Sequence, residues 1–222
     1  MNAKTNAAIE ALKYVKNGQT VGLGTGSTAA IFIDLLSKKV QNENLKIKCI
    51  PTSLSSKALA YQKGLVLIEP EEITTIDVAV DGADCIDSKK NLIKGGGGAH
   101  TREKIIDYFA QKFIVIADDS KFSKVLKGPV PLELLPFAYS FVEKAIKKEF
   151  GIKTELRRRE NGDVWKSDNG NFIADAHFRS IKNPKKLEGQ LNAIPGIVEN
   201  GIFSKNVSTV IIGYEKKVRV LK

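Results

Sequence analysis

Cysteine and histidine are scarce in this 222-residue sequence, which contains two of each. Cys49 and Cys85 stand apart with no CxxC spacing, and His100 and His177 have no partner at the spacing of metal ligands. A disulfide framework and a metal centre are therefore both disfavoured. Isolated cysteines fit a reducing compartment, so we expect a cytoplasmic location.

Long apolar runs are also absent, and no segment of the sequence is long enough to span a membrane. The N-terminus lacks the successive basic, apolar and small-residue zones of a signal peptide. What the chain does have is a hydrophobic content of 42%, which is enough for a real core. We expect one large or two modest domains and no membrane partner.

The formal net charge of +10 raises the question of a nucleic-acid partner. The lysines, however, are spread along the chain, and the densest basic cluster, Arg157–Arg159, lies beside Glu155 and Glu160. No aromatic-rich RNA-binding pattern, zinc-finger spacing or helix-turn-helix signature accompanies this charge. We therefore expect no nucleic-acid partner, and a basic surface that would favour a small anionic substrate.

The first part of the chain alternates between strand and helix patterns. Apolar periodicity predicts helices at 2–16, 29–40 and 55–64, and strands at 20–23, 46–50, 65–68, 76–80 and 112–117. This alternation predicts the α/β class, with a Rossmann-like, open, mostly parallel sheet that has helices on both faces.

The pattern changes after residue 128. It predicts strands at 130–137, 153–159, 172–178 and 197–203, and helices at 139–150 and 184–193. The order β-α-β-β-α-β is that of a smaller ferredoxin-like α+β domain, at 129–205. The apolar, β-branched segment 207–213 is expected to return to the first sheet. The predicted division is therefore a Rossmann-like catalytic domain at 1–128 and 206–222, and the small domain at 129–205.

A glycine-rich turn, Gly24–Thr28, follows the strand at 20–23 and opens a helix. Such a turn binds phosphate through backbone amides and hydroxyl groups. It lacks the lysine of a P-loop, and the strand at 46–50 does not end in the carboxylate that a dinucleotide site needs. A lone phosphate monoester fits better, although a glycine turn with simple helix capping is an alternative.

A second turn, Asp81–Asp84, follows the strand at 76–80. Carboxylates at the carboxyl end of a parallel strand lie where open sheets bind ligands. A tight turn can bring Asp81 and Asp84 to the same rim, where repulsion between them raises the pKa of at least one and lets it hold a proton. The alternative is a structural Asp-Gly turn.

A third turn is the uninterrupted glycine run Gly95–Gly98, between Lys94 and a predicted helix that contains Glu103. Four glycines favour close backbone approach, and the helix N-terminus favours an anion. Lys94 and Glu103 then place a cation and a carboxylate around one cavity; the alternative is a tight turn with solvated side chains. Lys121 follows the strand at 112–117 and could reach a phosphate, although a surface lysine is the commoner meaning.

Together these motifs resemble those of the ribose-5-phosphate isomerases of the A type, and the resemblance covers essentially the whole chain. It rests on Gly22–Thr28, on Asp81–Asp84 with Asp87, and on Lys94–Gly97 with Thr101–Ile105. The segments Ala117–Lys121 and Asn192–Gly196 also match. Each motif alone is unspecific, but three in this order and spacing are specific.

The resemblance implies interconversion of D-ribose 5-phosphate and D-ribulose 5-phosphate in the non-oxidative pentose phosphate pathway, with no metal or organic cofactor. It implies a homo-oligomer, either a dimer or a tetramer. It also implies that Glu103 is the general base and that Asp81, Asp84 and Lys94 line the reacting end of the sugar. The residues implied to bind substrate are Thr25, Gly26, Ser27, Thr28, Asp81, Gly82, Ala83, Asp84, Lys94, Gly95, Gly96, Gly97 and Lys121. Two positions depart from the family pattern, because Cys85 replaces an acidic residue and His100 an apolar one.

Three other functions fit the sequence less well. A non-catalytic sugar-phosphate sensor would need no base at Glu103, and the sequence has no attached DNA-binding module. A nucleotide-dependent enzyme is disfavoured by the missing P-loop lysine and the missing acidic partner. An RNA-binding role for the ferredoxin-like domain is opposed by the absence of aromatic RNA-contacting residues.

Overall fold

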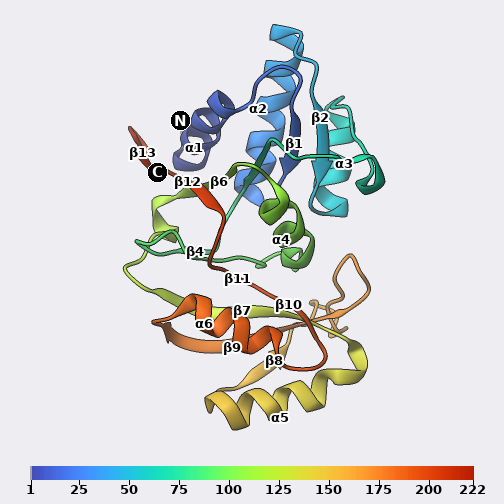
Figure 1. Cartoon of the computed structure of the whole chain (residues 1–222), viewed down its shortest axis with the longest axis vertical. Coiled ribbons are helices and arrows are strands. Elements are labelled where there is room, and N and C mark those ends of the chain that lie inside the picture. Colours follow the sequence, from blue (N-terminus) through green and yellow to red (C-terminus); the bar gives the residue numbers. More distant parts are fainter. Residues whose placement is uncertain (1) are drawn as a thin grey trace. The chain divides into compact units, whose positions relative to one another are not determined.

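The computed structural model describes residues 2–222 and divides into two compact units. Unit 1 comprises the chain up to Ala83, together with Arg102–Phe122 and Asn206–Lys222. Unit 2 comprises Asp84–Thr101 and Ser123–Lys205. Figure 1 shows both units, with labels on elements of each. The two domains predicted from the sequence, 1–128 with 206–222 and 129–205, are expected to fold independently. That domain division stays a prediction.

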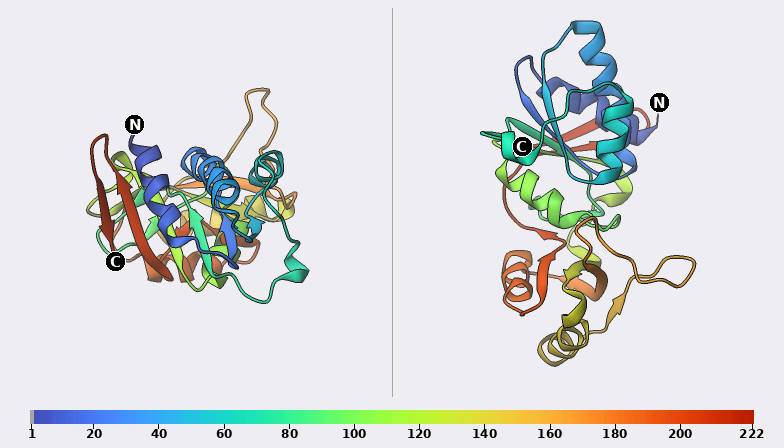
Figure 2. Two further views of the ribbon diagram at one scale, coloured as in Figure 1. Left: turned by 90° about the horizontal axis from the view of Figure 1, so that it is seen from above. Right: turned by 90° about the vertical axis from the view of Figure 1, so that its right-hand side faces the viewer.

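Unit 1 contains a six-stranded sheet in the order β13-β12-β6-β3-β1-β2. All neighbouring strands run parallel except β12 and β13, which form an antiparallel pair at one edge, drawn in dark red in Figure 2. The strands are β1 (Thr20–Leu23), β2 (Lys48–Pro51), β3 (Val78–Asp81), β6 (Phe113–Asp118), β12 (Val207–Gly213) and β13 (Val218–Leu221). The expected return of segment 207–213 to the first sheet is confirmed, because β12 pairs with β6.

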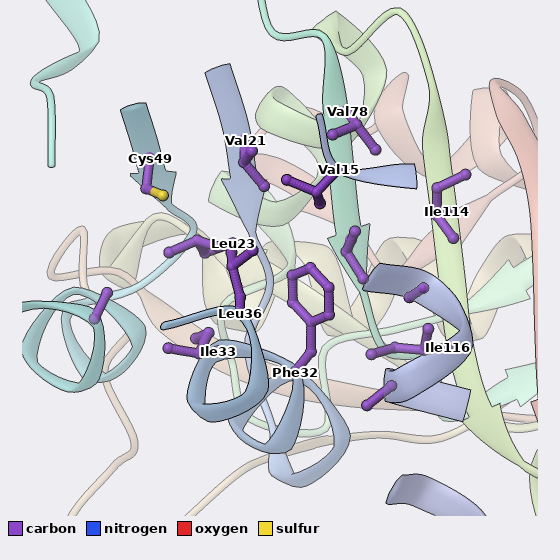
Figure 3. Close-up of a cluster of buried hydrophobic side chains, with 14 of the residues drawn as sticks. Val15, Val21, Leu23, Phe32, Ile33, Leu36, Cys49, Val78, Ile114 and Ile116 are labelled. Atoms are coloured by element: carbon purple, nitrogen blue, oxygen red, sulfur yellow. The ribbon is translucent and has the colours of Figure 1, made fainter. Parts of the chain in front are cut away.

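Helices cover both faces of this sheet, as predicted. They are α1 (Ala3–Ala11), α2 (Ser27–Glu43), α3 (Leu54–Gln62) and α4 (His100–Phe109), with short 3₁₀ turns at Leu12–Tyr14, Pro70–Glu72 and Asp119–Lys121. Leu23 of β1 packs in the same core as Phe32 of α2, and Figure 3 shows Phe32 pointing from its helix toward the strands. Full burial of such a side chain contributes roughly 1.5–3 kcal/mol.

The opposite face of the sheet is covered by α4. Side chains alternate between the two faces of a strand, so Gly22 faces away from the α2 side. A Cβ atom at Gly22 would lie 2.7 Å from Cγ2 of Ile106 and 2.9 Å from Cβ of Ala79. Glycine at this position therefore lets α4 approach the sheet closely.

Unit 2 contains a four-stranded antiparallel sheet in the order β10-β7-β9-β8. Its elements are β7 (Leu126–Leu134), α5 (Tyr139–Phe150), β8 (Thr154–Leu156), β9 (Phe172–Ile181), α6 (Pro184–Asn192) and β10 (Ile197–Asn200), with a 3₁₀ turn at Pro136–Ala138. Strands β7 and β8 are joined through α5 and separated in the sheet by β9. This is the split βαβ arrangement, so the predicted ferredoxin-like topology is confirmed.

Unit 2 also contains a three-stranded sheet that the sequence did not predict. It consists of β4 (Cys85–Ile86), β5 (Leu92–Ile93) and β11 (Ile202–Phe203), in the order β11-β5-β4. The predicted strand at 197–203 was therefore wrong as one element, because it breaks at Gly201 into β10 and β11. A Cβ atom at Gly201 would lie 2.3 Å from the carbonyl oxygen of Lys94, so only glycine fits between the two sheets.

Two further differences concern unit 1. The predicted strand at 65–68 is reduced to a single bridge between Leu67 and Cys49, and β13 was not predicted.

Within residues 2–222, no helix is both long and apolar enough to cross a membrane.

Candidate active site

The first predicted loop connects β1 to α2 in unit 1. Gly26 is the N-cap of α2, with a φ of 104°, and no side chain caps the helix there. Ser27 is exposed and Thr28 is buried in the first turn. The first amides of an α-helix lack intrahelical acceptors and carry partial positive charge, so this end of α2 can hold an anion.

Asp81 lies directly beneath this loop and is fully buried. Its Oδ1 accepts hydrogen bonds from the backbone N–H groups of Thr25 (3.0 Å) and Gly82 (2.6 Å). A Cβ atom at Gly24 would lie 2.1 Å from the same oxygen, which explains the glycine. The structure thus brings the first and second predicted motifs together at Thr25 and Asp81.

The Thr25 side chain is used within the protein. Its hydroxyl oxygen lies 2.7 Å from the hydroxyl oxygens of both Thr52 and Ser53, which follow β2. These bonds fix the loop on the neighbouring strand. Phosphate binding by this loop would therefore rely on backbone amides and on the hydroxyl groups of Ser27 and Thr28.

A lysine of α1 contacts the start of α2. Lys4 donates a hydrogen bond to Oγ of Ser27 (2.9 Å). Burial raises the pKa of Asp118, but hydrogen bonds from Ser120 and the charges of Lys121 and Lys4 outweigh it, so this pKa lies below its usual value. Both lysines therefore lie near Asp118, and Lys4 also contacts the first turn of α2. Lys121 was predicted from its place after a strand, whereas Lys4 was not predicted, because an isolated lysine in an alanine-rich helix carries no motif.

In unit 2, Asp84 precedes β4 and Lys94 follows β5, so both lie at the open end of the antiparallel β4–β5 hairpin. The backbone N–H of Asp84 donates to the carbonyl of Ile93 (2.8 Å), and Oδ2 of Asp84 accepts from the N–H of Gly96 (2.7 Å). Lys94 is only 2% exposed, and its Nζ lies 5.3 Å from the centroid of the Phe203 ring. A cation over an aromatic face is stabilised by the ring quadrupole.

Arg157 binds the glycine run through its guanidinium group, a role that was not predicted from the sequence. Its Nε and Nη2 grip the two carboxylate oxygens of Asp175, at 2.9 and 2.6 Å. Its Nη1 donates to the carbonyls of Gly95 (3.0 Å) and Gly96 (2.8 Å). This two-pronged pairing fixes the guanidinium plane and, through it, the loop. From sequence alone, Arg157 was part of a basic cluster without a partner.

The glycine run leads into α4 as expected. Gly96 and Gly97 are exposed, whereas Gly95 and Gly98 are buried. Glu103 lies in the first turn of α4 and is 4% exposed. The expectation that all three turns meet around one sugar stays a prediction, as do the assigned roles of these residues. Within residues 2–222, no group of three or more histidine, cysteine, aspartate or glutamate side chains is placed to hold a metal ion.

Comparison with known proteins decides the family. The model of the family described as ribose 5-phosphate isomerase A (phosphoriboisomerase A) matches residues 48–217. The chain belongs to this family. The ribose-5-phosphate isomerase A of Methanococcus aeolicus is 47% identical over 223 residues, which cover 99% of this chain and 94% of that protein. The corresponding protein of Methanocaldococcus jannaschii is 46% identical, with 99% and 97% covered.

Solved structures of ribose 5-phosphate isomerases share the fold. That of the M. jannaschii protein superimposes with a TM-score of 0.94 at 44% identity, covering 99% of this chain and 98% of that one. A D-ribose-5-phosphate isomerase in complex with phospho-erythronic acid superimposes with a TM-score of 0.96 at 44% identity, and both chains are fully covered. These matches extend over both units of the chain.

Proposed function

We propose that this chain interconverts D-ribose 5-phosphate and D-ribulose 5-phosphate through an enediolate, in the non-oxidative branch of the pentose phosphate pathway. The observation that carries the proposal is the 47% identity to a ribose-5-phosphate isomerase A along 99% of the chain. A relative of 44% identity binds phospho-erythronic acid, a phosphorylated sugar acid. The purified chain, incubated with ribose 5-phosphate and a metal chelator, should produce ketose. Absence of ketose would reject the proposal and favour the alternative, a non-catalytic sugar-phosphate sensor.

The substrate phosphate is proposed to bind at the start of α2. The uncapped helix N-terminus supplies amides, Ser27 and Thr28 supply hydroxyl groups, and Lys4 and Lys121 supply positive charge. Binding energy from a phosphate that takes no part in the chemistry can position the reacting carbons. This gives the first glycine-rich loop a binding role and no chemical step.

Four groups, three carboxylates and one ammonium, are proposed to carry out the chemical step. Glu103 removes a proton from the carbon next to the carbonyl and returns it to the neighbouring carbon; such a base contributes about 10²–10⁴-fold. Lys94 stabilises the negative oxygen of the enediolate, and one preorganised donor of this kind is worth roughly 3–4 kcal/mol. Asp81 and Asp84 move protons between the two sugar oxygens, and Asp81 assists ring opening.

The two lysines beside the phosphate loop should affect substrate binding more than turnover. We expect Lys121→Ala and Lys4→Ala each to raise KM for ribose 5-phosphate about tenfold or more, with a much smaller change in kcat, since each removes a charge-assisted contact to phosphate. Steady-state kinetics would measure both constants. Lys13→Ala, which removes an exposed lysine paired with Glu10, is the matched control and should leave KM unchanged. An unchanged KM in Lys121→Ala would exclude Lys121 from the phosphate site.

Arg157 should act through the loop it holds. We expect Arg157→Gln to lower kcat/KM by about tenfold or more, because Gly95 and Gly96 lose their shared donor and Asp84 loses a fixed partner amide. The neighbouring Arg158→Gln is the control, since Nη1 of Arg158 donates to the carbonyl of Gly162 within its own hairpin. Circular dichroism would show whether both variants are folded. Equal kinetics in the two variants would contradict a positioning role for Arg157.

The proposal also includes a homo-oligomer, dimer or tetramer, acting in the cytoplasm. The oligomer rests on the family resemblance, and the cytoplasmic location rests on the cysteine content of the sequence. Sedimentation velocity of the purified chain would measure the oligomer, and a single monomeric species would remove it from the proposal.

A further inference from the structure

A cavity of about 490 Å³ lies within unit 2, apart from the loops described above. Four chain segments line it, namely the turn between β4 and β5, the residues that lead into β7, the junction of β9 with α6, and Ser204 just after β11. Its volume is within the range of small-molecule sites in proteins, which is about 300–1,000 Å³. All of its lining residues belong to the same unit, so the cavity is a property of that unit alone.

Four lysines line this cavity and come from three of these segments, namely Lys89, Lys124, Lys182 and Lys185. All four side chains are exposed. Within residues 2–222 none of the four has an ion pair, whereas several other surface lysines, such as Lys38 and Lys57, are paired with carboxylates. Like charges gathered around a concave surface raise the local potential and attract anions.

The one carboxylate in the lining, Asp87, is occupied by its own turn. Its Oδ1 accepts from the N–H groups of Lys89 (2.8 Å) and Asn91 (2.9 Å), and its Oδ2 accepts from Nδ2 of Asn91 (2.8 Å). Asp87 is also only 6% exposed. This carboxylate shapes the turn that presents Lys89, and these hydrogen bonds to its oxygens come from amide groups of the turn, not from a lysine ammonium group.

We propose that this cavity binds a small molecule that carries at least two phosphate groups. One phosphate carries fewer than two full charges at neutral pH, so four lysines on three segments match a ligand with more than one such group. Val125, Ile181 and Pro184 also line the cavity and offer an apolar wall to the rest of the ligand. The site is distinct from the start of α2, which belongs to unit 1.

The turn at this cavity is also the tip of the β4–β5 hairpin. Strands β4 and β5 are two residues each, and Asp84 and Lys94 stand immediately outside them. The ligand would therefore contact a short hairpin whose opposite end carries two proposed site residues.

Calorimetric titration with pyrophosphate would test this site on the full chain. We expect the double variant Lys124→Gln/Lys182→Gln to bind pyrophosphate about tenfold or more weakly than the unmodified chain, since two charge-assisted contacts are lost. Its kcat and KM for ribose 5-phosphate without pyrophosphate should be unchanged. The matched control is Lys147→Gln/Lys148→Gln, which removes the same charge from exposed positions of α5 in the same unit and should leave pyrophosphate binding unchanged.

Each outcome decides the proposal. Unchanged pyrophosphate binding in Lys124→Gln/Lys182→Gln, or an equal loss in the α5 control, would overturn it, because binding would then reflect net charge or another site. A second titration, with short single-stranded DNA, distinguishes a small-molecule site from a surface that binds polyanions in general. If DNA binds more tightly than pyrophosphate and depends on the same two lysines, the small-molecule assignment is wrong. Thermal unfolding of both double variants would establish that they are folded.

Discussion

Replacing Glu103 with glutamine is expected to lower kcat by about 10²–10⁴-fold, the usual contribution of a positioned general base, with little change in KM. Glu103 lies in the first turn of α4 and is 4% exposed, so an amide of the same size preserves the packing while removing the base. Steady-state kinetics would give both constants. Exchange of the C2 hydrogen of ribose 5-phosphate with solvent should be lost in parallel, since the same group removes that proton.

A control for Glu103→Gln is Glu10→Gln, which alters a carboxylate of α1 paired with Lys13 and should retain full activity. If Glu103→Gln turned over substrate at nearly the original rate, another group would have to be the base. If kcat and hydrogen exchange diverged, proton removal and a later step would have to be assigned to different residues.

The largest expected effect on stability is at Glu133. This carboxylate is fully buried, and its Oε1 accepts from Oγ of Ser167 (2.8 Å), Nδ2 of Asn169 (3.0 Å) and Nδ2 of Asn171 (2.8 Å). We expect Glu133→Ala to lower the free energy of unfolding by about 3–5 kcal/mol, because three donors lose their acceptor and a cavity remains. Denaturant unfolding would measure it.

Two companion variants sharpen this test. Glu133→Gln keeps the size and one acceptor oxygen, so we expect it to recover roughly half of the lost free energy. Glu160→Ala removes an exposed carboxylate of the same unit and should have little effect. A loss in Glu133→Ala no larger than that in Glu160→Ala would show that this buried network contributes nothing net.

The pKa of Glu133 predicts how this stabilisation depends on pH. Burial raises the pKa, but hydrogen bonds from Thr101, Asn171, Asn169 and Ser167 outweigh it, so the pKa lies below its usual value. A lowered folded-state pKa means that the stabilisation is fully present above the unfolded-state pKa and is lost as the pH falls through the folded-state value. The difference in unfolding free energy between the unmodified chain and Glu133→Gln should therefore shrink in acid.

The fold could be predicted because its large elements carry strong local patterns. The segments at 112–117 and 207–213 each contain an apolar run rich in β-branched residues, as is typical of strands buried on both faces, and they form the neighbouring strands β6 and β12. The helix at 139–150 was predicted with its observed bounds, because its apolar spacing ends at Gly151, which adopts a left-handed φ of 67°.

The parts that sequence could not supply depend on contacts between distant segments. Strands β4, β5 and β11 are two residues each, too short to show any periodicity, and only their pairing defines them. The roles of Arg157 and Lys4 likewise depend on distant partners. Arg157 contacts Gly95, 62 positions away, and Lys4 contacts Ser27, 23 positions away. Motifs in the glycine-rich loops selected candidate residues, whereas the side chains that support those loops carry no pattern of their own.

The place of β12 in the sheet of unit 1 has a consequence for biosynthesis. This strand comes from residues 207–213, yet it lies between β13 and β6. A nascent chain that has already emerged from the ribosome through the whole of unit 2 still lacks it, so β6 would present an apolar edge with unpaired amides and carbonyls. Premature termination shortly before Val207 would thus release an aggregation-prone chain with an exposed strand edge, which chaperones would bind and proteases would degrade.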